Sequence, residues 1–255
     1  MGEAAYGWWL PVNISTHGGS VDHIIALLHG FMVLLFVGWG IFFIYCLIRF
    51  RQRPGQRAVY QPVHAKASKY IEVAVVIFEA VLLIGFSMPA WARFKHDFPA
   101  EKDALVVHVV AEQFAWNVHY PGKDGKFGRT APQFISSSNL LGLDPDDPDG
   151  KDDINAINQL HFPVNRPVIV RLTSKDVIHS FKIPVMRLTQ DIIPGTEIKI
   201  WFEANQTGKF DLACAQLCGL GHFRMRGAVS VDTPDEFAKW MVERESEVSG
   251  TGNEY

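Results

Sequence analysis

The chain has 255 residues, of which 48% are hydrophobic and 20% are charged, a balance that excludes disordered and fibrous proteins. Its net charge of −3 gives no basic footprint, so nucleic acid is not expected as a partner. Three cysteines cannot build a disulfide scaffold. The mean hydropathy of +0.06 is high for a soluble protein and indicates that part of the chain lies in lipid.

Two apolar segments predict a transmembrane helical hairpin. Residues 24–47 contain one ionisable side chain, His29, and would span about 36 Å as a helix, enough for a hydrocarbon core of about 30 Å. Residues 70–92 are similarly long and contain Glu72 and Glu79. The loop at residues 49–69 is basic without any acid, and residues 1–23 contain no Lys or Arg. The positive-inside rule therefore places the loop in the cytoplasm and both termini outside, which is the periplasm for a bacterial inner membrane.

The remaining sequence predicts an all-β domain at residues 93–248, followed by a tail at residues 249–255. Seven short β-branched or aromatic runs are expected strands, at residues 105–110, 114–120, 167–173, 177–183, 197–203, 209–213 and 227–231. This number of strands favours a sandwich or barrel. Thr233, Pro234 and Glu236 form a capping box that predicts a closing helix.

Six aspartates gather in residues 144–153. We interpret this segment as a solvated insertion, with a docking or calcium site as the alternative. Calcium is disfavoured because Pro145 takes the place of the first ligand of a calcium loop and no bidentate Glu follows.

The most informative segment lies at residues 214–225, where Cys214, Cys218, His222 and Met225 form the pattern CxxxCxxxHxxM. Thiolate, imidazole and thioether ligands favour copper over hard cations. Zinc is the competitor, but structural zinc sites rarely use Met. The alternative without metal is a Cys214–Cys218 disulfide. Spacing alone does not select a further histidine among His108, His119, His161 and His179.

This motif, the upstream sequence DVIHSF at residues 176–181 and the two preceding spans resemble subunit II of haem–copper cytochrome c oxidases. The resemblance covers residues 20–245 and implies a cupredoxin-like Greek-key domain that holds the dinuclear CuA centre, with two coppers per chain. On that pattern the copper ligands are His179, Cys214, the backbone carbonyl of Gln216, Cys218, His222 and Met225.

Two positions depart from the family pattern. Gln216 stands where the family has a Glu that reaches magnesium or manganese at the subunit I boundary; a neutral amide is a weaker ligand for a hard cation, so that metal is in doubt. Phe114 stands where the family has the Trp that receives electrons. By the resemblance, Phe114 and Trp116 receive electrons from the donor; the alternative is two aromatics in a half-buried strand.

Two acidic residues of the second span have separate interpretations. Glu72 matches a family glutamate at the cytoplasmic mouth of the K proton pathway; the alternative is a residue that reaches into the headgroups. Glu79 lies seven residues on, about 10 Å deeper on nearly the same helical face. The family requires no acid there, and an intramembrane carboxyl is a functional candidate by default, most simply facing subunit I.

The resemblance implies an oxidoreductase subunit that accepts single electrons from a c-type cytochrome and passes them to haem in subunit I, where oxygen is reduced and protons are pumped. The chain lacks the haem-attachment motif CxxCH, so we expect a separate donor, soluble or within a supercomplex. The expected partners are subunit I, the other oxidase subunits, this cytochrome and membrane lipid. The alternatives are a membrane-anchored copper chaperone, a copper-free quinol-oxidase type of subunit II and a single-copper carrier.

Overall fold

The computed structural model describes residues 10–58, 60 and 65–251. The chain divides into two compact units. The helical unit is Ser20–Asp97, and the β unit joins the residues up to Gly19 with the chain from Phe98 onward.

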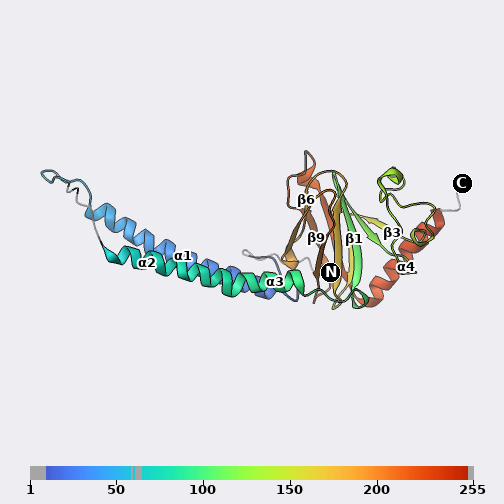
Figure 1. Ribbon diagram of the computed structural model, residues 1–255, viewed down its shortest axis with the longest axis horizontal. Helices are drawn as coiled ribbons and strands as arrows, with labels where there is room; N and C mark the ends of the chain where they lie inside the picture. Colours follow the sequence, from blue (N-terminus) through green and yellow to red (C-terminus); the bar gives the residue numbers. More distant parts are fainter. Residues whose placement is uncertain (1–9, 59, 61–64, 252–255) are drawn as a thin grey trace. The chain divides into compact units, whose positions relative to one another are not determined.

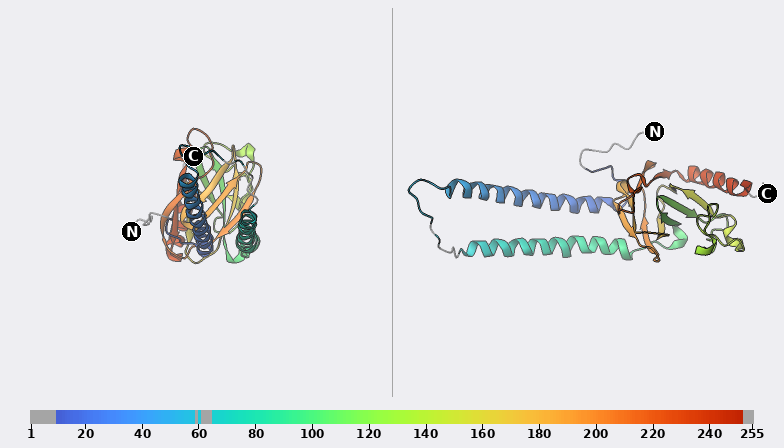
Figure 2. Two further views of the ribbon diagram at one scale, coloured as in Figure 1. Left: turned by 90° about the vertical axis from the view of Figure 1, so that its left-hand side faces the viewer. Right: turned by 90° about the horizontal axis from the view of Figure 1, so that it is seen from above.

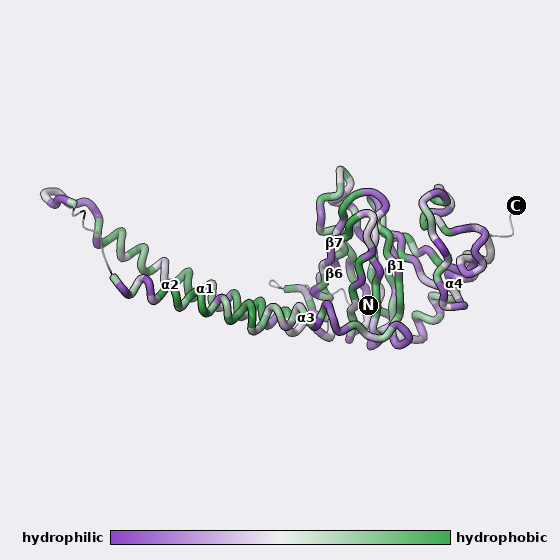
Figure 3. Tube along the Cα trace, viewed as in Figure 1, coloured by the Kyte–Doolittle hydropathy of each residue, from purple (hydrophilic) through white to green (hydrophobic). Residues whose placement is uncertain are grey.

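The helical unit is an antiparallel pair (Figure 2). Its first helix is α1 (Gly18–Arg49); the second combines α2 (Lys66–Leu82), the π-helical turn η1 (Leu83–Ser87) and α3 (Met88–His96). Phe31 of α1 packs against Phe78 of α2, with ring centroids 4.4 Å apart. Both helices are long and apolar enough to cross a membrane, and their hydrophobic residues continue along most of their length (Figure 3). The prediction of two apolar helices is confirmed, and each expected span lies inside one of them.

The β unit contains two five-stranded sheets (Figure 1). One sheet has the order β3-β2-β1-β5-β8 and the other β4-β10-β9-β6-β7. The β1–β5 and β4–β10 pairs are parallel and the other pairs are antiparallel. The strands are β1 (Leu105–Glu112), β2 (Ala115–Tyr120), β3 (Ile154–Ile157), β4 (Gln159–Pro163), β5 (Val168–Ser174), β6 (His179–Ile183), β7 (Leu188–Ile192), β8 (Ile198–Phe202), β9 (Gly208–Cys214) and β10 (Arg226–Asp232).

All seven expected strands are present, with bounds shifted by one or two residues, whereas β3, β4 and β7 were not expected. These three are short and carry polar residues such as Asn155, His161 and Gln190, which hide the alternation that marks a strand. Strand β1 shows that alternation, because Val107, Val109 and Ala111 are fully buried between the sheets.

The acidic segment is folded onto the outer face of β2. Asp153 accepts a hydrogen bond from the backbone of Gly128 at 2.8 Å, and its Oδ2 lies 2.6 Å from Nε2 of His119. Asp147 accepts hydrogen bonds from the backbone N–H groups of Arg129 and Asp149. Both aspartates are buried. The expectation of a solvated insertion is therefore wrong for these two residues.

The segment before α1 belongs to the β unit. Ile14 is fully buried and donates its backbone N–H to Val185, while its carbonyl accepts from Asn205. Ser15 forms a β-bridge with Ala204, just after the edge strand β8. These bonds hold the N-terminal segment against the domain that follows the second span.

The closing helix α4 (Pro234–Thr251) begins as expected. Glu236 accepts a hydrogen bond from the backbone N–H of Thr233, and the Thr233 hydroxyl accepts from the N–H of Glu236. Trp240 of α4 stacks on His161 of β4, with centroids 4.2 Å apart and rings 9° from parallel. Residues 252–255 of the expected tail lie outside the described residues.

Candidate metal centre

The cluster lies where two neighbouring strands meet one loop. His179 is the first residue of β6 and Cys214 is the last residue of β9, and Phe181 pairs with Cys214 across these antiparallel strands. His179 and Phe181 are two residues apart, so their side chains lie on one face. The loop that leaves β9 returns to β10 through the short helix η6 (His222–Arg224). Cys214 donates its backbone N–H to Met225, which brings the two ends of this loop together.

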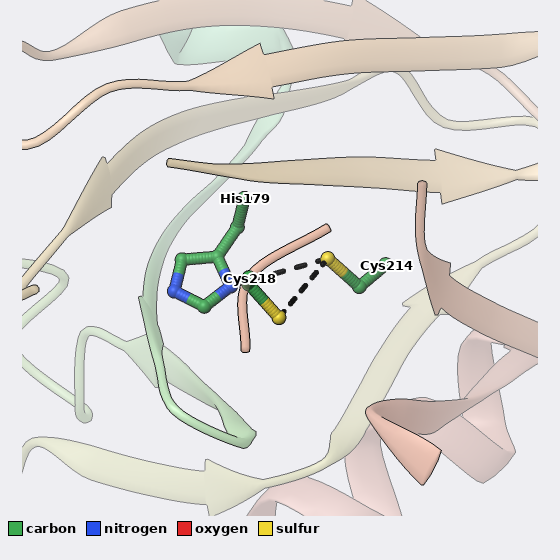
Figure 4. Close-up of side chains that lie close together, drawn as sticks. All are labelled: His179, Cys214 and Cys218. Carbon is green, nitrogen blue, oxygen red and sulfur yellow. Dashed lines mark hydrogen bonds between the residues drawn. The ribbon is translucent and has the colours of Figure 1, made fainter. Parts of the chain in front are cut away.

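Three donor atoms converge at the centre. His179 Nδ1 lies 3.9 Å from Cys214 Sγ, and the two sulfur atoms of Cys214 and Cys218 are 3.9 Å apart. All three donor atoms lie within 4.8 Å of one another and all three residues are buried (Figure 4). Both cysteines are free thiols, and no disulfide joins them.

The rest of the loop adds three further donors. Cys218 Sγ lies 3.6 Å from His222 Nδ1 and 3.7 Å from Met225 Sδ. Cys214 Sγ lies 3.1 Å from the backbone carbonyl oxygen of Gln216. Every residue expected as a copper ligand therefore contributes an atom to one cluster, while the Gln216 side chain belongs to an exposed residue.

Asp176 fixes the imidazole of His179. Its Oδ1 lies 2.9 Å from Nε2 of His179, so this ring nitrogen carries the proton and Nδ1 presents its lone pair to the cluster. The same carboxylate accepts the backbone N–H groups of Val177 and Gln113. These bonds connect two segments, the turn at Gln113 and the stretch that carries His179.

Burial, followed by the neighbouring Cys214, raises the pKa of the Cys218 thiol to about 11. A thiol in this environment keeps its proton until a cation takes that proton's place. A buried pair of thiols with imidazole and thioether nearby is a soft donor set, which fits copper and not magnesium or calcium. The residues present therefore fit a copper centre.

The turn at Gln113 and Phe114 packs on the loop from Cys214 to Met225, which carries most of the proposed ligands and is called the ligand loop. Gln113 Nε2 donates to the carbonyl of Cys218 at 2.6 Å. A Cβ added at Gly221 would overlap the Phe114 ring, and one at Gly219 would lie 3.2 Å from its Cζ. Phe114 is partly exposed beside the loop. It lies directly against the segment that carries the donors.

Trp116, which was expected to receive electrons from the donor together with Phe114, does not lie at the protein surface. Its side chain is fully buried, with its ring centroid 6.3 Å from that of His179. A docked protein cannot touch a fully buried residue, so contact with a donor at this position is excluded by burial. Trp116 instead packs against the ring of His179.

The other candidates lie away from the cluster. His119 pairs with Asp153 and His161 pairs with Asp232, while His108 stacks on Phe127. Glu72 and Glu79 lie on α2 of the helical unit. Two contributions to the site were not predicted from the sequence: the contact of Gln113 with the loop and the positioning of His179 by Asp176. For Asp176, the only local signal is that an acid lies three residues before His179.

The sandwich and its soft donor set define a cupredoxin-like domain with a candidate metal site, which follows two apolar helices in the chain. Residues 105–231 match the family described as "Cytochrome C oxidase subunit II, periplasmic domain". The alternative cytochrome c oxidase subunit 2 of Bradyrhizobium diazoefficiens is 34% identical over 240 residues, covering 94% of this chain and 84% of the relative. The chain belongs to the cytochrome c oxidase subunit II family.

Two solved structures are also similar. The crystal structure of the periplasmic domain of cytochrome oxidase subunit II of Bradyrhizobium japonicum is 32% identical and covers 56% of this chain and 95% of that one, with a TM-score of 0.42. A mixed disulfide intermediate between a thioredoxin-like protein and subunit II of cytochrome c oxidase gives 30% identity, 60% and 99% coverage, and a TM-score of 0.42.

Family membership has three consequences. The chain is a subunit of a haem–copper terminal oxidase, an oxidoreductase, and associates with other oxidase subunits. It is a membrane protein with a periplasmic domain. The family implies copper, and His179, Cys214 and Cys218 form the candidate site.

Proposed function

We propose that the β unit holds a dinuclear CuA centre, which accepts single electrons from a c-type cytochrome and passes them to haem in subunit I for oxygen reduction coupled to proton pumping. The observation that carries this proposal is the convergence of His179 Nδ1 with the sulfur atoms of Cys214 and Cys218. The nearby donors of Gln216, His222 and Met225 support a second metal position in the same cluster.

The six residues that would hold the metal are His179, Cys214, Gln216 through its backbone carbonyl, Cys218, His222 and Met225. When bound, the two coppers would supply one-electron redox chemistry. The protein's task is to keep its ligands still as the charge of the centre changes. Gln113 holds the carbonyl of Cys218, Asp176 holds the His179 ring, and the backbone of Met225 is bonded to Cys214. These restraints keep the ligand geometry similar in both redox states, so little reorganisation opposes each electron.

The surface over the centre supports a contact with the electron donor. Leu217, Leu220 and Phe223 on the ligand loop are 76%, 98% and 87% exposed, and Phe114 is partly exposed beside them. We assign Phe114 as the residue through which the donor contacts the ligand loop. Trp116 then serves as packing behind His179.

We propose that the chain crosses a bacterial inner membrane twice, with the basic loop in the cytoplasm and both termini in the periplasm. The bonds of Ile14 to Val185 and Asn205 support it, because they hold the segment before the first span to the domain after the second. We assign Glu72 to the cytoplasmic mouth of the proton pathway by resemblance. Gln216 offers a neutral amide, which disfavours magnesium or manganese at the subunit I boundary.

The ligand thiols must be reduced before they can bind copper. Cys214 and Cys218 lie 3.9 Å apart, close enough to form a disulfide after a small movement. We propose that a thioredoxin-like dithiol reduces this disulfide by donating two electrons and two protons, becoming a disulfide itself. The mixed disulfide solved for a relative supports this step.

Rapid mixing of the copper-loaded full chain with a reduced c-type cytochrome tests the proposal. We expect the cytochrome to be oxidised as the copper absorption bleaches, one electron per chain, and Cys218→Ser as the matched control to remain inactive. Copper transfer to an apo-protein without cytochrome oxidation would instead identify a chaperone. Reduction by a quinol alone would identify a quinol-oxidase subunit.

A further inference from the structure

A groove of about 420 Å³ lies in the helical unit. Its walls come from both long helices, and one carboxyl group opens into it. The residues that define it are Phe31, Met32 and Leu35 of α1 with Glu79, Leu83 and Ser87 of the opposite helix. Apart from Glu79 and Ser87 these side chains are apolar. The groove is therefore an apolar surface with one strong hydrogen-bonding group, the carboxyl group of Glu79.

Glu79 lies close to the middle of the membrane. It is two residues from the centre of the apolar segment at residues 70–92, and Leu35 lies at the centre of the segment at residues 24–47. Two residues of helix correspond to about 3 Å, whereas the headgroups begin about 15 Å from the bilayer centre. Lipid headgroups therefore do not reach this carboxyl.

The described residues offer Glu79 no side-chain partner: none of their hydrogen bonds or ion pairs involves its carboxyl group. An acidic side chain at this depth costs about 2.5 to 3.5 kcal/mol when unpaired. Intramembrane acids usually face a protein interior, where another group satisfies them. Among the residues that the structure describes, the carboxyl group of Glu79 is therefore open to a partner from a neighbouring chain.

The backbone beside Glu79 also departs from a regular helix. The N–H of Leu83 points at the carbonyl oxygens of both Ala80 and Glu79, where the helix changes into the π-helical turn η1. Such turns are frequent at functional sites because they displace side chains from a regular helical face. Here the turn supplies Leu83 and Ser87 to the rim of the groove.

We propose that Glu79 and this groove receive a transmembrane helix of another oxidase subunit, which presents a hydrogen-bond donor side chain to the carboxyl group at mid-membrane depth. The proposal rests on the membrane-spanning oxidase role and names the contact by which the subunits recognise each other. The apolar walls pack against the incoming helix, and the single polar bond sets its register.

Co-purification of the complete oxidase tests this contact. The tagged full chain is expressed with the other subunits of its oxidase, purified in mild detergent, and assayed for haem per polypeptide. Glu79→Leu removes the carboxyl, Glu79→Gln keeps its size and hydrogen-bonding capacity, and Ser87→Leu fills the groove while keeping Glu79. Copper content is measured in parallel, so that a failure of the proposed metal function is seen separately.

We expect Glu79→Leu and Ser87→Leu each to lower the haem recovered per polypeptide roughly three- to tenfold, in the range of single interhelical hydrogen bonds, and Glu79→Gln to retain it. Full haem recovery with Glu79→Leu would overturn the proposal. Full recovery in all three variants, with oxygen reduction lost in Glu79→Gln, would also overturn it and identify Glu79 as a proton carrier.

Discussion

The Nε2 atom of His179 lies 2.9 Å from Oδ1 of Asp176, which leaves the opposite ring nitrogen facing the two cysteines. The carboxylate determines which tautomer the ligand adopts, and its own position is fixed by two backbone N–H groups. An aspartate outside the proposed ligand set thus orients one of the proposed ligands.

Asp176→Ala should weaken copper binding roughly 10- to 100-fold, the usual cost of losing such a partner. The histidine would then be free to rotate and to change tautomer. Copper retained by the full chain during titration with a chelator measures the effect. Asp211→Ala removes the same charge from an exposed position of β9 and should bind copper normally; equal loss in both variants would contradict a specific role.

Met225→Leu should change the copper spectrum without changing the fold. Met225 is buried with its sulfur 3.7 Å from that of Cys218, and Leu has nearly the same volume, so a cost below about 1.5 kcal/mol is expected. Electron paramagnetic resonance and thermal unfolding measure the two effects. Met186→Leu is the control, because Met186 is a buried methionine of the β unit outside the donor cluster. Identical copper spectra in both variants would remove Met225 from the ligand set.

Gly221→Ala should displace either the ligand loop or the Phe114 ring, because the added methyl group overlaps that ring. We expect altered copper spectra and slower electron uptake from a c-type cytochrome. Combining it with Phe114→Ala removes the overlap and should restore the spectrum. Phe114→Trp alone should leave the spectrum unchanged and alter only the uptake rate. A spectrum that the second substitution fails to restore would contradict the packing described.

Oxidation of the full chain should abolish copper binding by joining Cys214 to Cys218, and a dithiol reductant should restore it. Mass spectrometry before and after reduction detects the two lost protons. Cys46→Ser serves as the control, since Cys46 lies in α1 and not in the cluster. Copper binding that survives complete oxidation would contradict a ligand role for the pair.

Stability of the β unit should fall as the pH falls from about 6.5 to about 4. Burial, with the charges of His119 and Arg171, lowers the pKa of His108 from 6.5 to about 4. Between these values the unfolded chain binds a proton that the folded chain does not, so stability is complete above the unfolded pKa and decreases below it. His108→Phe keeps the stacking on Phe127 and should show a shallower decrease of the unfolding temperature; identical pH curves would contradict the prediction.

Local patterns predicted most of the architecture. The two apolar helices, the capping box at Thr233 and seven strands follow from periodicity and turn chemistry. The folding of Asp153 onto His119 did not, because it depends on a contact between residues far apart in the chain. A run of aspartates looks the same in sequence whether its carboxylates accept hydrogen bonds from water or from backbone N–H groups.

The donor set was predictable to the extent that it is local. Cys214, Cys218, His222 and Met225 lie within one loop, so their spacing already indicated a soft metal site. His179 was selected by resemblance alone, since three other histidines had equal claims. The hydrogen bond from Gln113 to the carbonyl of Cys218 joins two distant segments, and no local pattern contains that information.

Copper stoichiometry combined with electron paramagnetic resonance on the copper-loaded full chain tests the central claim most directly. The full chain is needed because buried Ile14 belongs to the β unit although it precedes the first span. We predict two coppers per chain that share one unpaired electron. One copper with a localised spin, or a Cys214–Cys218 disulfide without copper, would contradict the assignment of a CuA centre.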